Sequence, residues 1–448
     1  MIKTFSSLVL FLVLACTSTD LVAQSGMEFH EFKRRIEPYF AEELIEDLRE
    51  AMPQGASYRI WGWDVGDFSG DGIYDIAFSV NVLGTRKRES IVYLFIDTDG
   101  FLVNIARYPF TYVDLPLEVG VVIRDGGCYI TQKRKADHWM IRGYQYRDGA
   151  VLLLDEFTSD KIGTFAHEAY RNYRTLETSE RFLNAQGEEE FTVDYLTIPS
   201  YERGRQVYAG FVADAVVEQT KHVREGAFWW KGPEDASFSA KIVYDESYLY
   251  LRIAVKDSTV VTGWCDTCPA DRIDVWLDVT PPEGESGSRS ITNVDRSKLT
   301  IRSVADSGLF QFAVKIGDFA DIRPSVKVRT TDDLDPAQEG AVEQLRIVTA
   351  QRSDGYVVKV RIPFVLLGYE TAPVEDRFLT ELGLTIGLHD VDNEFRPEES
   401  SFLASSSIRT LDPSSYGAVR FVPDGLWYGE TVNIYVDAVL GQLRELGF

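Results

Sequence analysis

The chain has 448 residues, 45% of them hydrophobic and 26% charged, and a formal net charge of −24. The length predicts about two or three domains, and the hydrophobic share is ordinary for a globular protein with real cores. Because nucleic acid and anionic membranes would repel so negative a chain, the charge argues against both as partners and favours an exported protein that uses cations.

The N-terminus has the features of an export signal. Lys3 precedes the apolar run Leu8 to Ala15, which is too short to span a bilayer and has the right length for a signal-peptide core. Two processing sites remain open: an ordinary signal peptide covering residues 1–23, or a lipoprotein signal covering residues 1–15 with a lipid anchor on Cys16. Both predict export to the periplasm, the outer-membrane surface or the exterior.

Helical segments are expected at both ends of the mature chain, over residues 27–55 and 425–448. Residues 28–53 contain two short amphipathic patterns separated near Pro38. The C-terminal pattern "ETVNIYVDAVLGQLRELGF" also has helical spacing. We expect its apolar face to pack on the core, because its polar face lacks the basic cluster of a membrane-binding helix.

Residues 56–158 are predicted to form a small antiparallel β-meander. Asp-Gly pairs recur at Asp99, Asp125 and Asp148, and each is flanked by β-branched or aromatic residues. Asp-Gly supplies the positive φ angles that tight hairpins need. Residues 159–195 are polar and weakly patterned, with no clear strand signal, so we expect a linker or capping segment there.

The stretch "GDFSGDGIYD", residues 66–75, has the pattern of a calcium loop. Four side chains with oxygen atoms occupy loop positions 1, 3, 5 and 9: Asp67, Ser69, Asp71 and Asp75. Ile73 at position 7 can offer its backbone carbonyl, and Gly72 permits a sharp turn. Three carboxylates this close repel one another unless a cation lies between them. A plain acidic turn is the alternative.

The segment after this loop is strand-like rather than helical. Position 12 is Phe78 where an EF-hand has glutamate, and "IAFSV" follows. A calcium loop followed directly by a strand, here "GDFSGDGIYDIAF", resembles the FG-GAP repeat of integrin-like β-propellers. "DTDGF" at 97–101 looks like a second copy but lacks ligands at positions 1 and 9. The resemblance therefore implies one bound Ca2+ and no complete propeller.

The C-terminal half contains an ordered series of strand-like segments. They are "FWWKGPEDASFSAKIVYDESYLYLRIAVKDS" (228–258), "DRIDVWLDV" (271–279), "GYVVKVRIPFVLLG" (355–368), "LGLTIGLHDVDN" (382–393) and "DPSSYGAVRF" (412–421). Residues 248–253 alternate between aromatic or charged and aliphatic side chains, as in a half-buried strand. The series resembles the family 9 carbohydrate-binding modules and their relatives. It implies an antiparallel, jelly-roll-like β-sandwich over residues 196–424.

Members of this family that bind sugar hold it between two tryptophans on loops. By the resemblance, Trp264 occupies the first of these positions. The second position has no tryptophan, since Ile408 or Arg409 stands there, and Phe402 is a substitute. The series thus implies glycan binding through Trp264 and Phe402, with phenylalanine in place of one of the two usual tryptophans.

Cysteine usage fits export. "CDTC" places Cys265 and Cys268 next to Trp264, and we interpret the pair as a disulfide that tightens the loop. A redox pair or half of a zinc site are the alternatives, although no second Cys or His pair follows. Cys128 lies in the strand-like "GGCYITQ" and is expected to be a buried thiol.

The sequence predicts a mainly β protein without catalytic activity. It has no GxSxG, phosphate loop or Rossmann fingerprint, and its histidines lack metal spacing. Two functions remain open. One is an exported carbohydrate-binding protein of the bacterial envelope or exterior, with a polysaccharide or glycan as partner. The other is an envelope structural or protein-interaction module whose sandwich has lost sugar binding.

Overall fold

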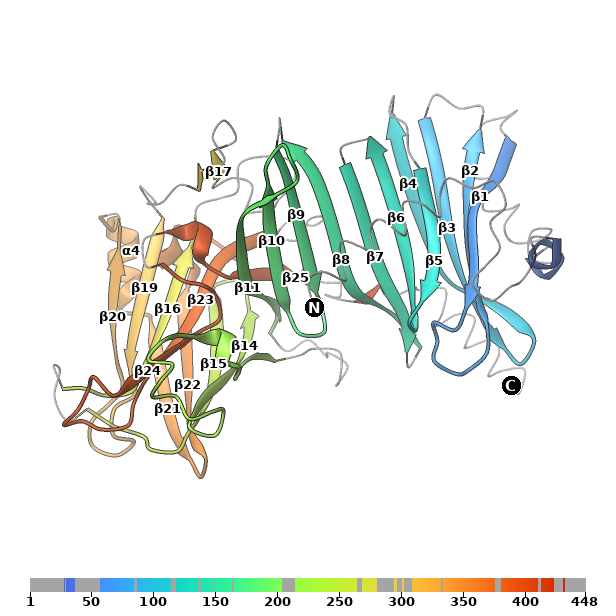
Figure 1. Cartoon of the computed structure of the whole chain (residues 1–448). Helices are drawn as coiled ribbons and strands as arrows, with labels where there is room; N and C mark the ends of the chain where they lie inside the picture. Colours follow the sequence, from blue (N-terminus) through green and yellow to red (C-terminus); the bar gives the residue numbers. More distant parts are fainter. Residues whose placement is uncertain are drawn as a thin grey trace. The chain divides into compact units, whose positions relative to one another are not determined.

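A computed structural model describes much of the chain between residues 28 and 431. The described residues are 28, 30–36, 57–83, 87–113, 118–135, 138–147, 149–162, 165–203, 214–263, 268–279, 294–295, 300–301, 308–331, 333–374, 380–409, 412–422 and 430–431. They lie mainly in β-strands, which confirms the predicted fold class (Figure 1). No helix among them is long and apolar enough to cross a membrane.

The chain divides into two compact units. Unit 1 comprises residues 1–161, 168–170 and 429–448, and unit 2 comprises residues 162–167 and 171–428. Residues 1–23, which contain the predicted export signal and Cys16, lie outside the described residues.

Unit 1 contains two antiparallel sets of strands. The first is a meander in chain order: β1 (Ser57–Gly66), β2 (Asp75–Leu83), β3 (Lys87–Thr98) and β4 (Phe101–Val113). The second set is β5 (Glu118–Arg124), β6 (Gly127–Lys135), β7 (His138–Arg147) and β8 (Ala150–Ile162), with β26 (Glu430–Thr431) paired to β8. Asp99 and Asp125 both have φ of 52°, so the Asp-Gly hairpin turns are confirmed at these two positions.

A short helix, residues 30–36, packs on the meander. Phe32 and Ile36 are buried, and the Phe32 ring stacks on Trp63 with centroids 4.5 Å apart. The predicted helical segment is therefore confirmed at residues 30–36, and residues 37–55 of it lie outside the described residues. At the C-terminus, Glu430 and Thr431 are extended, because they complete backbone hydrogen bonds with β8. The prediction of a helix over residues 425–448 is therefore wrong at these two positions. Residues 432–448 lie outside the described residues.

The prediction that residues 159–195 form a linker or capping segment without strands is also wrong. These residues contain β9 (Phe165–Asn172), β10 (Glu177–Leu183) and the start of β11 (Glu189–Glu202). The inward positions of β10 include buried Glu180, which accepts a hydrogen bond from the Tyr195 hydroxyl (2.6 Å) and lies 3.2 Å from His167 Nε2. A buried polar network thus replaced the apolar alternation that marks a strand.

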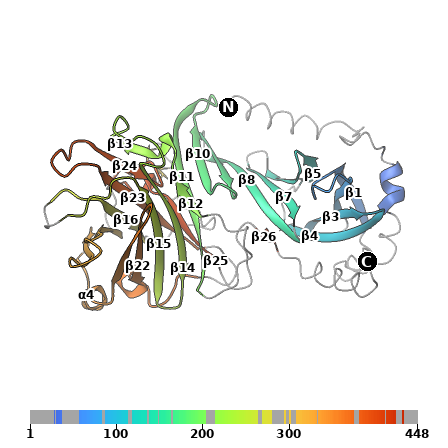
Figure 2. The same ribbon diagram turned by 90° about the horizontal axis from the view of Figure 1, so that it is seen from below.

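Unit 2 contains two groups of strands joined by β11. One antiparallel group has the order β12–β14–β15–β22–β21: β12 (Ala215–Val217), β14 (Ala236–Tyr244), β15 (Tyr248–Asp257), β22 (Gly355–Pro363) and β21 (Arg346–Arg352). Strands β14, β15 and β22 lie side by side in Figure 2. This group carries alternating faces, since Leu249, Leu251, Ile253 and Val255 are at most 2% exposed.

The second group has the order β20–β19–β16–β23–β24–β13. These strands are β20 (Ser325–Thr330), β19 (Leu309–Lys315), β16 (Arg272–Asp278), β23 (Thr380–Val391), β24 (Ser400–Ala404) and β13 (Val223–Glu225), and β25 (Ala418–Val422) also pairs with β23. Strand β11 runs parallel to β14 and β25, so the sheet is mixed rather than wholly antiparallel.

Short elements complete the described part of unit 2. They are α4 (Pro336–Val342), the 3₁₀ turns η1 (Thr220–His222), η2 (Phe364–Leu367) and η3 (Pro413–Ser415), and the pair β17 (Val294–Asp295) and β18 (Thr300–Ile301).

Candidate functional site

The predicted calcium loop of unit 1 connects β1 to β2, and backbone amides occupy its carboxylates. The amide of Gly70 donates to Asp67 Oδ1 (2.6 Å), and the amide of Gly72 donates to Asp67 Oδ2 (2.9 Å). The Ile73 amide donates to Asp71 Oδ1 (2.8 Å), and the Asp71 side chain is exposed. These bonds close the loop around Asp67.

Asp75 is the buried member of this loop. Its Oδ2 accepts the amides of Phe68 and Ser69, both at 2.9 Å, and its Oδ1 accepts the amide of Asp97 at 3.1 Å. The side chain is fully buried, and this burial raises its pKa to about 6 although the three amides act in the opposite direction. Asp75 therefore ties the loop to β3.

The predicted sugar-clamp residues have different positions in the structure. Trp264 and Cys265 lie outside the described residues, whereas Cys268 is described and disulfide-bonded. Phe402 is 8% exposed, packs edge-to-face on Trp276 and stacks on the His389 ring at 4.3 Å. Its ring is thus part of the core and presents no open face in this structure.

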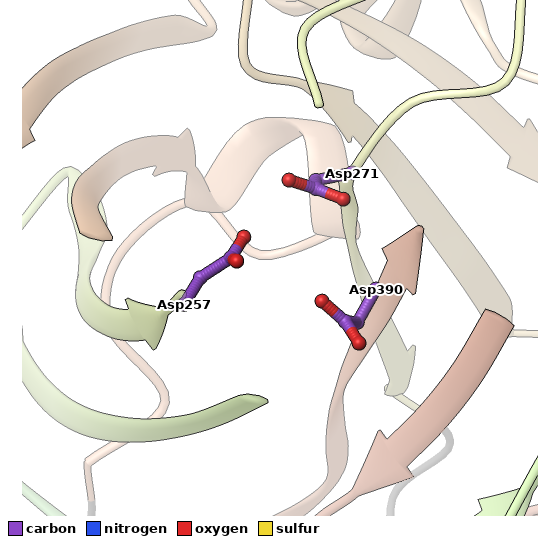
Figure 3. A group of neighbouring side chains, drawn as sticks. All are labelled: Asp257, Asp271 and Asp390. Carbon is purple, nitrogen blue, oxygen red and sulfur yellow. The ribbon is translucent and has the colours of Figure 1, made fainter. Parts of the chain in front are cut away.

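Three buried aspartates of unit 2 form a cluster that we call the aspartate triad: Asp257, Asp271 and Asp390. Asp257 ends β15, Asp271 immediately precedes β16, and Asp390 is near the end of β23. One carboxylate oxygen from each lies within 4.8 Å of the other two. Figure 3 shows the three side chains approaching one another from separate segments. Among the described residues, no such group includes Asp67, Asp71 or Asp75.

Backbone hydrogen bonds hold Asp271 in place. The amides of Val261 and Val391 donate to its two oxygens at 2.8 and 2.9 Å. One carboxylate therefore joins the segment before β16 to the loop after β15 and to the end of β23. The Asp271 side chain is fully buried.

The other two carboxylates each keep one oxygen without a donor. Asp257 Oδ1 accepts the Thr259 amide (2.6 Å), and Asp390 Oδ2 accepts the Ser401 hydroxyl (3.1 Å). Within the described part of the chain, no N–H or O–H donates to Asp257 Oδ2 or Asp390 Oδ1, and both side chains are at least nine-tenths buried. An orphaned buried carboxylate oxygen is costly unless a proton or a cation accompanies it.

The pKa values of groups in and beside the triad also reflect its buried negative charge. The Tyr356 hydroxyl is buried without a hydrogen-bond partner among the described residues, and burial together with the triad's charges raises its pKa well above the ordinary value. Burial, followed by the charge of Asp257, raises the pKa of Asp390 to about 7 and that of Asp271 well above its usual range.

The triad's donor set suits a divalent cation. Calcium binds oxygen ligands at about 2.3–2.6 Å and accepts six to eight of them, and the triad offers up to six carboxylate oxygens. Glycoside hydrolysis also uses paired carboxylates, but a sugar must reach them. All three side chains are at most 5% exposed, so an ion can fit where a sugar ring cannot.

Sequence reasoning missed the triad. Each aspartate ends or precedes an apolar strand segment, "IAVKD", "DRIDVWL" and "IGLHD", but nothing in their spacing joins three positions so far apart in the chain. An ionisable residue at the end of each of three buried strands was the available signal.

Exposed aromatic side chains lie on loops at the same end of these strands. Phe228 is 87% exposed and Trp229 37%, and their rings meet edge-to-face at 5.1 Å in the loop before β14. Phe395, 85% exposed, is in the loop after β23. Lys231 Nζ donates to Asp392 Oδ2 (2.5 Å), which joins these two loops. We call Phe228, Trp229 and Phe395 the aromatic end.

Comparisons with known proteins gave few matches. No family model and no curated protein matches the chain. Among solved structures, a carbohydrate binding module family 9 from Caldicellulosiruptor kristjanssonii in complex with cellotriose matches with a TM-score of 0.29 and 15% identity, covering 50% of this chain and 93% of that one. The same module in complex with glucose matches at the same TM-score and identity, covering 51% and 98%. Likeness at this level carries no argument about the ligand of this chain.

Proposed function

We propose that this chain is an exported, non-catalytic carbohydrate-binding protein in which unit 2 holds the sugar. The exposed aromatic end carries this proposal. Soluble proteins leave few large aromatic rings in open water, and clustered ones mark binding surfaces. Aromatic faces suit sugars because the axial C–H face of a pyranose is apolar, while neighbouring polar groups can bond to its hydroxyls.

Trp264 belongs to the same proposal. Its loop starts after Asp257 and ends before Asp271, so it connects two members of the triad. A ring on this loop would add to the exposed rings of Trp229 and Phe395. Since Phe402 is in the core, we propose that Trp264 and the aromatic end form the sugar platform in its place.

We further propose that the triad holds one Ca2+. The ion would neutralise the buried carboxylates and join the ends of β15 and β23 to the start of β16. Those three points are the bases of the loops that present the platform. The cation would thus set the positions of the aromatic rings without touching the sugar.

The loop of unit 1 is proposed to hold a second Ca2+ through Asp67, Ser69, Asp71, Asp75 and the Ile73 carbonyl. An ionised carboxylate has about four lone-pair sites, and backbone amides fill only part of those on Asp67 and Asp71. The FG-GAP resemblance supports this site.

A glycan array followed by calorimetric titration tests sugar binding. We expect a weak affinity, on the order of 0.1 to 1 mM or about 4 to 5.5 kcal/mol. Trp264→Ala and Trp229→Ala should each abolish detectable binding at the aromatic platform with little change in the melting curve. Trp61→Ala is the matched control, because Trp61 is also exposed (47%) but belongs to unit 1. A wild type that binds no glycan would defeat the proposal and favour a protein-interaction module.

A further inference from the structure

A row of cationic side chains crosses the solvent face of β14, β15 and β22. The strand register places Lys241 opposite Arg252, and Arg252 opposite Lys359. In the next row, Arg361 on β22 faces Arg346 on β21. Directly opposite side chains in a sheet have Cβ atoms about 4.5–5.5 Å apart. We call these five residues the basic groove.

A hollow lies over the basic groove. Its volume is about 410 Å³, which falls within the range of roughly 300–1,000 Å³ typical of ligand sites. All five cations line it, together with Val348, whose side chain is 59% exposed and ends the first row. The hollow therefore combines positive charge with a patch of apolar surface.

Part of the charge in the basic groove has a local partner. Lys241 forms an ion pair with Asp214 (3.0 Å), and the Arg361 guanidinium lies over the Tyr248 ring (4.5 Å). Arg346 donates to backbone carbonyls of the turn before β21, which bear no net charge. These contacts fix the rims of the groove.

The centre of the groove is not neutralised. Within the described part of the chain, neither Arg252 nor Lys359 forms an ion pair or a side-chain hydrogen bond, and both are exposed. Like charges directly opposite each other destabilise a sheet. In a chain with 70 Asp and Glu residues against 46 Lys and Arg, an acidic residue in this row would relieve the repulsion, yet the row contains none.

We propose that the basic groove binds an acidic glycan, one that carries carboxylate or sulfate groups on its sugars. This inference rests on the proposed function that the chain binds sugar, and it adds a second site on the sheet face, separate from the aromatic end, with its own class of sugar. Arginine recognises carboxylate and sulfate through paired, charge-assisted hydrogen bonds, and lysine adds a point charge. Exposed Val348 offers an apolar contact for the C–H face of a ring.

The same surface is poorly suited to single-stranded nucleic acid. Such ligands bind by stacking bases on open aromatic faces. The two tyrosines beside the groove are covered, Tyr248 by Arg361 and Tyr250 by Arg203 at 4.8 Å. The net charge of −24 also repels a long polyanion, whereas a short acidic oligosaccharide meets mainly the local field.

Affinity measurements with short oligogalacturonates test the inference, because their methyl-esterified form is a neutral ligand with the same backbone. We expect the full chain to prefer the acidic form, with an affinity that falls as salt rises. The double change Arg252→Gln with Lys359→Gln should weaken binding by about tenfold or more, since it removes both charged hydrogen-bond donors from the centre of the groove. The melting temperature should stay the same or rise.

A matched control removes the same charges elsewhere. Lys327→Gln with Arg329→Gln takes one lysine and one arginine from β20 and should leave binding unchanged. Equal affinity of wild type and groove variant for the oligogalacturonates, or binding of neutral glycans alone, would overturn the groove while leaving the proposed function intact. Binding of no glycan at all would overturn the proposed function as well. Preferential binding of a short oligouridylate that the groove variant loses would overturn the assignment to glycans.

Discussion

Two acidic regions of this molecule satisfy their carboxylates in opposite ways. In the loop between β1 and β2, backbone amides donate to Asp67, Asp71 and Asp75, and Asp75 alone accepts three of them. In the aspartate triad, Asp257 and Asp390 each bury an oxygen that no donor of the described chain reaches. Only the loop has a recognisable calcium-binding pattern in the sequence. The triad makes the stronger demand for a cation.

The difference shows that acidic residues indicate a cation site when their buried oxygens lack hydrogen-bond donors from the protein. A loop whose carboxylates are capped by amides can fold without metal, and calcium then adds to a structure already formed. A buried carboxylate group with orphaned oxygens must take up protons or a cation when it folds. Cation removal should therefore affect unit 2 more than the loop of unit 1.

The largest expected effect is at the triad. Calcium at 100 to 1,000 times its dissociation constant should stabilise the wild type by about 3–4 kcal/mol against unfolding. Asp390→Asn should lose most of this gain because one charged ligand is gone. In chelator, the variant should be at least as stable as the wild type, since the amide relieves charge repulsion. Urea unfolding with calcium and with chelator measures both quantities.

Asp71→Ala is the control for that comparison. It removes an exposed carboxylate from the loop of unit 1 and should leave the calcium gain of unit 2 in place. If Asp71→Ala abolishes the calcium response while Asp390→Asn keeps it, the ranking of the two regions is wrong.

A smaller effect is expected at Asp75. Asp75→Asn exchanges an acceptor of three amides for a side chain with one acceptor oxygen, and it buries an NH2 group facing amide donors. The loss should be about 2–3 kcal/mol, because each unsatisfied buried group costs about 1–3 kcal/mol. The loss should be present in chelator, and it should be somewhat larger in calcium because Asp75 is also a proposed ligand. A loss seen only in calcium and absent in chelator would show that Asp75 acts mainly as a ligand.

The smallest effect is expected at His222, a buried imidazole that accepts hydrogen bonds from backbone amides. His222 Nδ1 accepts the amides of Glu218 (3.2 Å) and Gln219 (3.3 Å), and burial lowers the pKa of this histidine from 6.5 to about 4. Between these values the unfolded chain binds more protons than the folded one, so stability falls as pH drops from 6.5 to 4. The whole shift corresponds to about 3 kcal/mol, and we expect about 1–2 kcal/mol of it because residues 218–221 around His222 are exposed to solvent that screens its charge.

His222→Gln keeps an acceptor but removes the titration. The difference in unfolding free energy between this variant and the wild type should therefore change with pH across the same interval. A difference that is constant from pH 7 to pH 4 would contradict the neutral, amide-bonded imidazole.

Much of the fold follows from patterns that the sequence displays openly. The alternation over residues 248–253 predicts which face of β15 is buried, and Asp99 and Asp125 mark hairpin turns. Strands β9 and β10 could not be predicted in this way, because Glu180 and His167 fill inward positions where apolar residues are expected. Periodicity reports burial only when the buried residues are apolar.

The candidate site was less predictable than the fold. Phe402 looks like a ring available to sugar, yet its neighbours His389 and Trp276 come from other strands and enclose it. The triad and the basic groove arise from strand order and register, which bring distant residues together. Local sequence contains the residue types of such sites but not their pairing.

Sugar binding with and without calcium tests the central claim most directly, namely that the triad positions an aromatic sugar platform. The best ligand from a glycan array would be titrated into the wild type in calcium and in chelator, with Asp390→Asn alongside and circular dichroism as a check on folding. The account predicts binding in calcium, binding weaker by about tenfold or more in chelator, and weak binding by Asp390→Asn in both. Equal affinity of the folded wild type with and without calcium would contradict it.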